Sequence, residues 1–102
     1  MILIELKKVR KDFKHLRKAE ALRLYIESKL DSQTPVEINC LTTGEIPEKF
    51  ADELYGKLCV KYELELIKRL VTITHMRSKE NVFQKVLDSR FAEKINTSSI
   101  AS

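Results

Sequence analysis

The residue types that most often carry out chemistry are few in this chain and lie far apart. The histidines are His15 and His75, and the cysteines are Cys40 and Cys59. Nucleophilic and metal sites need several such groups at close spacing, and neither a CxxC motif nor a close pair of ligands occurs. Phosphate-cradling loops need glycines, of which the chain has two. We therefore predict no enzymatic activity, no metal site and no cofactor.

Lysine and arginine are the functional residues whose spacing is informative. Seven of them fall between positions 7 and 18, against the single acid Asp12. On an α-helix, the 4-3-4 spacing of the four lysines would form a row about 16 Å long. Such a row can neutralise several phosphates of DNA or RNA without reading the base sequence. The expected nucleic-acid-binding residues are Lys7, Arg10, Lys11, Lys14, Arg17 and Lys18.

The distribution of charge leaves an alternative to nucleic-acid binding. Residues 1–29 hold nine Lys/Arg and four acids, residues 30–66 hold three and eight, and residues 67–102 hold seven and three. The acidic middle could therefore pair with the basic stretch inside the fold. The basic side chains could also form an ordinary solvated helix face, or meet an acidic protein or a membrane surface.

Length and composition indicate one small domain inside the cell. The chain has 102 residues, of which 43% are hydrophobic and 33% charged. No apolar run is long enough for a membrane span, and the N-terminus lacks the pattern of a secretory signal. The two cysteines are expected to be reduced and buried, which favours an intracellular location: the cytoplasm, or the nucleus in a eukaryote.

The first element that must present these cations is expected to be a helix from Ile2 to about Leu30. Its apolar residues at 2, 6, 9, 13 and 16 recur at helical spacing. After residue 19 the phase changes, and a second apolar stripe begins. Residues 2–6 also alternate, so a short strand there could pair with the alternating residues 36–40.

The second half of the chain is expected to be helical as well. Pro47 suits the first turn of a helix, and Gly56 within that helix indicates close packing or a break. Residues 58–76 are apolar around most of the helical circumference, which predicts a central buried helix. Ser78 or Asn81 would cap the last helix. The predicted fold is mainly α: a bundle of about four helical segments in one domain, residues 1–95, with at most one short strand pair (residues 2–6 and 36–40) and a flexible tail, residues 96–102.

The second apolar stripe of the first helix predicts an interface. Leu22, Ile26 and Leu30 face away from the first stripe, so one small core covers both only if the helix bends or is wrapped. We therefore expect these three residues to lie between subunits of a homo-oligomer or of a protein complex.

Two segments resemble a known family. Residues 46–54, IPEKFADEL, resemble the Leu-Pro-Glu-Asp-Phe helix opening of archaeal GINS replication-complex subunits. Residues 82–95 are similar to the closing helix of their helical domain, with Arg90 followed by Lys94 and Ile95. The family's small β-rich domain is missing, and the segment before Pro47 is longer. The resemblance implies a non-catalytic scaffold in DNA replication.

Together these observations predict a non-enzymatic, basic helical interaction module. It would be a subunit of an oligomer or of a nucleic-acid-associated assembly, and its Lys/Arg stripe would contact phosphate. The alternative is a GINS-like protein–protein scaffold without direct nucleic-acid contact.

Overall fold

A computed structural model describes residues 1–76 and 81–101, with the side chains of the last helix as far as Arg90 and of Ala92. Three strands form a parallel sheet in the order β1-β2-β3: β1 (Ile2–Glu5), β2 (Val36–Asn39) and β3 (Val71–Thr74). Ile2 pairs with Val36, which pairs in turn with Val71. The fold is therefore a small α/β globule, and the predicted helical bundle with at most one strand pair is wrong.

The segment from residue 2 to residue 31 is three elements instead of one helix. After β1 follows a 3-10 helix, η1 (Leu6–Asp12), then a turn, and then α1 (Leu16–Asp31). The alternation of residues 2–6, and not their helical spacing, describes the structure. In β1 the side chain of Ile4 points into the core, whereas that of Leu3, on the other face, is 53% exposed. Leu6 and Val9, three positions apart, then suit the three-residue turn of η1.

Residues 58–76 also divide, into two helices and a strand. A helix, α3 (Lys57–Lys61), ends at extended Tyr62, and α4 (Leu64–Leu70) leads directly into β3. The prediction of a single central helix is wrong. Residues 71–74 are all β-branched, which disfavours a helix and favours a pleated strand.

The remaining helices are α2 (Glu48–Ala51), η2 (Asp52–Gly56) and α5 (Val82–Ala101). Together α2, η2 and α3 form one continuous helix, in which η2 is a π-helical turn. A Cβ on Gly56 would overlap the Asp52 carboxylate and lie 3.4 Å from Cγ of Arg90. Of the two alternatives expected for Gly56, close packing is confirmed, and the helix is not broken there but continues through a π-helical turn.

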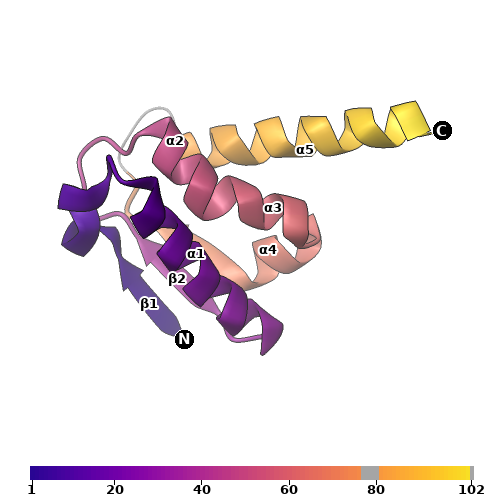
Figure 1. Cartoon of the computed structure of the whole chain (residues 1–102). Coiled ribbons are helices and arrows are strands. Elements are labelled where there is room, and N and C mark those ends of the chain that lie inside the picture. The colour runs from indigo at the N-terminus through magenta and orange to yellow at the C-terminus, as the bar shows by residue number, and fades with distance from the viewer. Residues whose placement is uncertain (77–80, 102) are drawn as a thin grey trace.

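The helices lie on one side of the sheet (Figure 1). The chain moves in the same direction across the sheet in both crossovers, from β1 to β2 and from β2 to β3, and this places successive helices on the same face. Burial agrees, because Ile4, Ile38 and Val71 on the inner face are buried. The outer face, which holds the exposed residues Leu3 and Thr72, is not covered by any element in the described part of the chain.

The residues that we expected at an interface lie in this core. Ile26 is fully buried, Leu30 is 2% exposed, and Leu22 packs against them. The phase change after residue 19 therefore does not expose a second stripe, because η2, α2 and the sheet all contact α1. The burial of these side chains requires no second chain.

The last helix begins at one of the two expected caps but extends beyond its expected end. Asn81 caps it, since its Oδ1 accepts hydrogen bonds from N–H of Phe83 and of Gln84. Ser78, the other expected cap, lies outside the described residues. The helix α5 continues through residues 96–101, the segment expected to be a tail.

Candidate anion-binding surface

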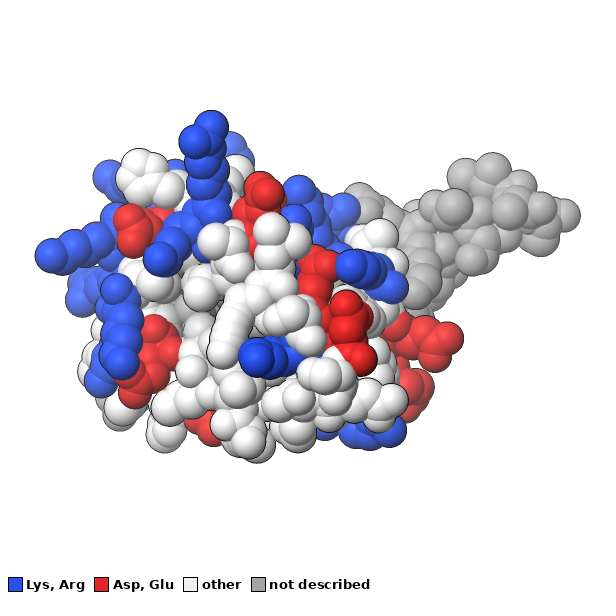
Figure 2. Space-filling model, turned by 60° about the horizontal axis from the view of Figure 1, so that its bottom comes forward, with Lys and Arg blue, Asp and Glu red and all other residues white. Residues whose placement is uncertain are grey.

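The six predicted cations share one end of the molecule. Lys7, Arg10 and Lys11 lie on η1, Lys14 lies in the turn that follows, and Arg17 and Lys18 begin α1. All six residues are exposed. Figure 2 shows Lys and Arg side chains gathered at the end of the molecule where η1 lies in Figure 1. We refer to these six residues as the basic surface.

The basic surface is not the straight row that the spacing predicted. Because residues 6–12 form a 3-10 helix, residues three apart share a face, and Lys7 lies above Arg10. Lys11 points about a third of a turn away. The turn before Leu16 then separates this group from Arg17 and Lys18. The result is two short basic groups in place of one ridge.

Apolar contacts hold the basic surface in place. Leu6 at the start of η1 is fully buried, and Val9 packs against the core. At the end of η1, the ring of Phe13 lies 4.8 Å from that of Phe50 on α2. The exposed cations of η1 therefore project from a helix that is anchored at both ends.

The acids of the middle segment do not neutralise the basic surface. Their ion pairs go to cations elsewhere, such as Lys85, which pairs with Glu48 at 3.1 Å, and Arg90, which pairs with Asp52 at 2.7 Å. Among the described residues, the one ion pair within positions 7–18 joins Lys8 to Glu5 at 2.9 Å. The six cations of the basic surface have no acidic partner there.

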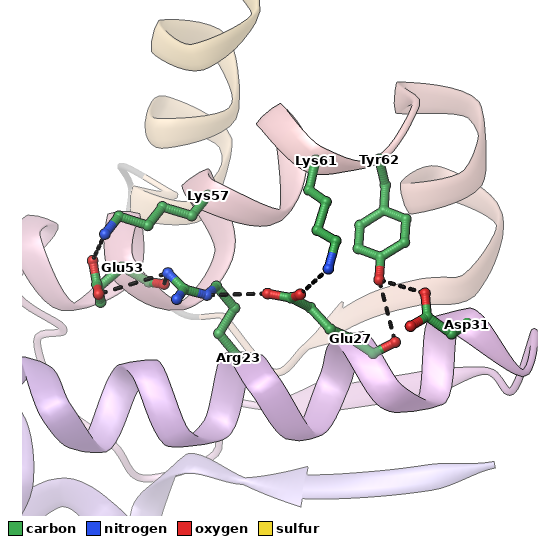
Figure 3. A network of polar contacts seen from close by, with 7 residues as sticks. All are labelled: Arg23, Glu27, Asp31, Glu53, Lys57, Lys61 and Tyr62. Carbon is green, nitrogen blue, oxygen red and sulfur yellow. Dashed lines mark hydrogen bonds and ion pairs between the residues drawn. The ribbon is translucent and has the colours of Figure 1, made fainter.

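Most of the paired charge lies between α1 and the η2–α3 helix (Figure 3). Nη1 of Arg23 lies 3.6 Å from the Glu53 carboxylate, and Nε lies 3.2 Å from the Glu27 carboxylate without hydrogen-bond geometry. The side chains of Arg23, Glu27 and Glu53 are each 13% exposed. We call this group the ion-pair cluster; it consists of Arg23, Glu27, Asp31, Glu53, Lys57, Lys61 and Tyr62.

The outer members of the cluster complete its hydrogen bonds. Nζ of Lys57 lies 2.6 Å from Glu53, and Nζ of Lys61 lies 2.5 Å from Glu27. The Tyr62 hydroxyl donates to Oδ1 of Asp31 at 2.7 Å. Desolvation, followed by this hydrogen bond, raises the pKa of Tyr62 to about 12. The hydrogen bond to Glu27 likewise raises the pKa of Lys61.

The start of α1 adds to the positive potential of the basic surface. Its first turn contains no acid, and the N-cap residue, His15, makes no side-chain cap hydrogen bond. The positive end of the helix dipole therefore lies beside the charges of Arg17 and Lys18. The two positive potentials add, so anions are attracted to this end of α1.

The groups that might have supported catalysis are dispersed. Both cysteines are buried, and burial raises the pKa of the Cys40 thiol to about 11, so this thiol is protonated at neutral pH. His15 and His75 are exposed. Within the described residues, no three His, Cys, Asp or Glu side chains group as metal ligands, and no helix is long and apolar enough to cross a membrane.

Comparison with known proteins identifies no relative of this chain. A scan of protein-family models and searches of curated proteins and of solved structures each find no significant match to the chain. We therefore infer the function from the surface of the protein itself.

Sequence reasoning missed the ion-pair cluster. One signal was available, because Arg23 and Glu27 are four positions apart, the spacing of helical ion pairs. Their partners on η2 and α3 are 30 and 34 residues further along the chain, and no local pattern predicts that contact.

Proposed function

We propose that this chain is a non-enzymatic binding module whose basic surface contacts the phosphate backbone of a nucleic acid. The observation that carries the proposal is the separation of charge. Among the described residues, the acids that form ion pairs do so with cations outside the basic surface, so its six cations keep their charge available for an external anion.

The binding mode follows from the residue types. Arginine and lysine contact phosphate oxygens without distinguishing bases, and each contact releases a counterion, so affinity falls with salt. The lack of an exposed aromatic side chain in η1 argues against stacking on single-stranded bases, because the ring of Phe13 is 7% exposed and packs on Phe50. DNA and RNA duplexes are therefore both suitable partners. Because nucleic acids of this kind are found inside cells, we propose a location in the cytoplasm, or in the nucleus of a eukaryote.

The experiment is a titration of a fluorescent DNA duplex and a matched RNA duplex, followed by anisotropy between 50 and 300 mM salt. Exchange of Lys7, Lys11, Lys14 and Lys18 for Gln should reduce the slope of log affinity against log salt by up to about four units. The matched control exchanges Lys29, Lys49, Lys68 and Arg69 for Gln, which removes the same net charge elsewhere. Equal losses in both variants would show that net charge, and not the basic surface, determines binding.

Two further probes identify competing partners. Vesicles with anionic lipid test a membrane surface, and an acidic peptide tests a protein partner. Binding of the vesicles or the peptide in preference to both duplexes would assign the basic surface to that partner and reject the nucleic-acid proposal.

The second candidate function is a protein–protein scaffold, as the GINS resemblance implies, in a homo-oligomer or a larger complex. The observation that favours it is the uncovered outer face of the sheet, because parallel sheets in proteins are nearly always covered on both faces. Light scattering after size-exclusion chromatography tests self-association. If the protein is a monomer at every concentration, a homo-oligomer is excluded, and a scaffold function would require a partner protein of different sequence.

A further inference from the structure

A cavity of about 580 Å³ lies at the carboxyl edge of the sheet. It is partly open to solvent and is lined by the loop after β2, by Met76 after β3, and by Val82 and Lys85 at the start of α5. Its size is within the range of small-molecule sites, and ligands of parallel α/β sheets generally bind at this edge.

The lining of the cavity is part apolar and part polar. Cys40 and Ile46 are each 4% exposed and form apolar wall. The hydroxyl of Thr42, backbone groups of the loop and the Lys85–Glu48 ion pair supply polar groups. A hydrocarbon ligand would displace water from these polar groups without replacing its hydrogen bonds, which is unfavourable, so the lining suits a ligand with both kinds of surface.

The backbone around the cavity adopts an uncommon conformation. Thr42 has φ 58°, Gly44 has φ 71°, and His75, directly before Met76, has φ 58°. Left-handed non-glycine residues are strained and gather at binding sites. In the described part of the chain, the N–H of buried Ile46 has no hydrogen-bond acceptor, so this wall retains a free donor.

Arg10 of the basic surface lies beside one wall of the cavity, although it is not one of the lining residues. Its Nη2 lies 3.8 Å from the position that a Cβ on Gly44 would occupy, and Gly44 lines the cavity. An anionic group held by Arg10 and a body within the cavity can therefore belong to one small molecule. The planar guanidinium with its fork of donors matches phosphate better than an ammonium group does.

We propose that this cavity binds a nucleotide, with the phosphate at Arg10 and the base and sugar between the loop and the start of α5. The proposal rests on the proposed function in one respect, the use of Arg10 as a phosphate ligand. The mixed lining matches a base, which has apolar faces and polar edges, and the hydroxyl-rich sugar.

The test is methyl-resolved NMR of the full chain during titration with adenosine or uridine 5′-monophosphate. Either nucleotide should shift the methyl signals of Ile46, Met76 and Val82, whereas inorganic phosphate and adenosine should shift them at least tenfold less at equal concentration. Equal shifts with phosphate alone, or no shift with either nucleotide at 10 mM, would overturn the proposal.

Variants locate the two halves of the ligand. Val82→Trp, which fills the cavity, should weaken nucleotide binding at least tenfold, and Val60→Trp, at a 55% exposed position on α3, should not. Arg10→Gln should weaken it at least fivefold, and Lys8→Gln, at the residue paired with Glu5, should not. Unchanged nucleotide binding in both Val82→Trp and Arg10→Gln would reject the proposed nucleotide site.

Duplex binding distinguishes failure of this inference from failure of the proposed function. A chain that binds duplex with a steep salt dependence but shows no nucleotide shifts keeps its basic surface and loses the cavity proposal. A chain that binds nucleotide at the cavity but no duplex keeps the cavity and loses the nucleic-acid function.

Discussion

The basic surface and the ion-pair cluster each include residues of α1, and they differ in what surrounds each charge. In the cluster, Arg23 is 13% exposed and lies between two carboxylates. Six residues earlier on the same helix, Arg17 is exposed and has no acidic partner among the described residues. The comparison indicates that the cluster serves the fold, whereas the basic surface is available for binding.

The largest difference between the two regions should appear on removal of one arginine from each. Arg23→Met should lower the free energy of unfolding by about 2–4 kcal/mol, because it leaves Glu27 and Glu53 poorly compensated in a desolvated site. The loss stays below that of an isolated buried pair, since Lys57 and Lys61 remain.

Arg17→Met is the matched control for this measurement. It should change stability by less than about 0.5 kcal/mol, as is usual for exposed positions, while it weakens duplex binding. Urea denaturation measures the first quantity, and anisotropy measures the second. If Arg23→Met costs no more than Arg17→Met, the cluster does not stabilise the fold.

Gly56→Ala tests whether the ion pair between Asp52 on η2 and Arg90 on α5 depends on the π-helical turn. In a regular helix this exchange would stabilise by about 1 kcal/mol. Here the new Cβ would displace the Asp52 carboxylate from its two-point contact with Arg90, so we expect a net loss of about 1–2 kcal/mol. A gain in melting temperature would show that Asp52 moves aside without cost.

Tyr62→Phe should cost about 1 kcal/mol at neutral pH, because it removes the hydrogen bonds to Asp31 and to the Glu27 carbonyl. The folded pKa of Tyr62 is about 12, above its ordinary value of 10, so the neutral hydroxyl is the form that stabilises the fold. This contribution is complete below pH 10 and is lost as the pH rises to 12.

The wild type should therefore lose more stability than Tyr62→Phe between pH 10 and pH 12. Burial also raises the pKa values of Tyr55 and Cys40, but those groups are common to both proteins and cancel in the difference. Parallel curves of unfolding free energy against pH would contradict the assignment to Tyr62.

The smallest expected effect has opposite signs in stability and in binding. Lys18→Glu places an acid in the first turn of α1, where the helix dipole favours it, and should stabilise by about 0.5 kcal/mol. It should also weaken duplex binding. Lys29→Glu, at the other end of the helix, should destabilise by a similar amount without effect on binding. Stabilisation by both exchanges would show that net charge alone determines the response.

The sequence predicted the composition of the basic surface but not its shape. The six cations are exposed as their position opposite the apolar residues indicated, yet the helix that was to align them is a 3-10 turn, a bend and a new helix. The alternation of residues 2–6 competed with a helical spacing over the same residues, and pairing with β2, thirty-four positions away, decided between them.

The third strand had a local signal that the surrounding residues obscured. Val71, Thr72, Ile73 and Thr74 are β-branched, but they follow a strongly apolar stretch that reads as a buried helix. The core position of Ile26 was likewise beyond local reasoning, because the elements that cover α1 are formed by residues far along the chain. The close packing at Gly56 and the cap at Asn81, whose signals are local, were predicted correctly.

The register of the sheet has a consequence for the time course of folding. Ile2 pairs with Val36 and Val36 with Val71, so each strand pairing joins residues 34 or 35 positions apart. The entropy of closing two such loops must be lost before any ladder bond forms, whereas the turns of α1 and α5 form locally. We therefore expect the helices to form first, the sheet to assemble last, and the chain to fold more slowly than a helical bundle of equal length.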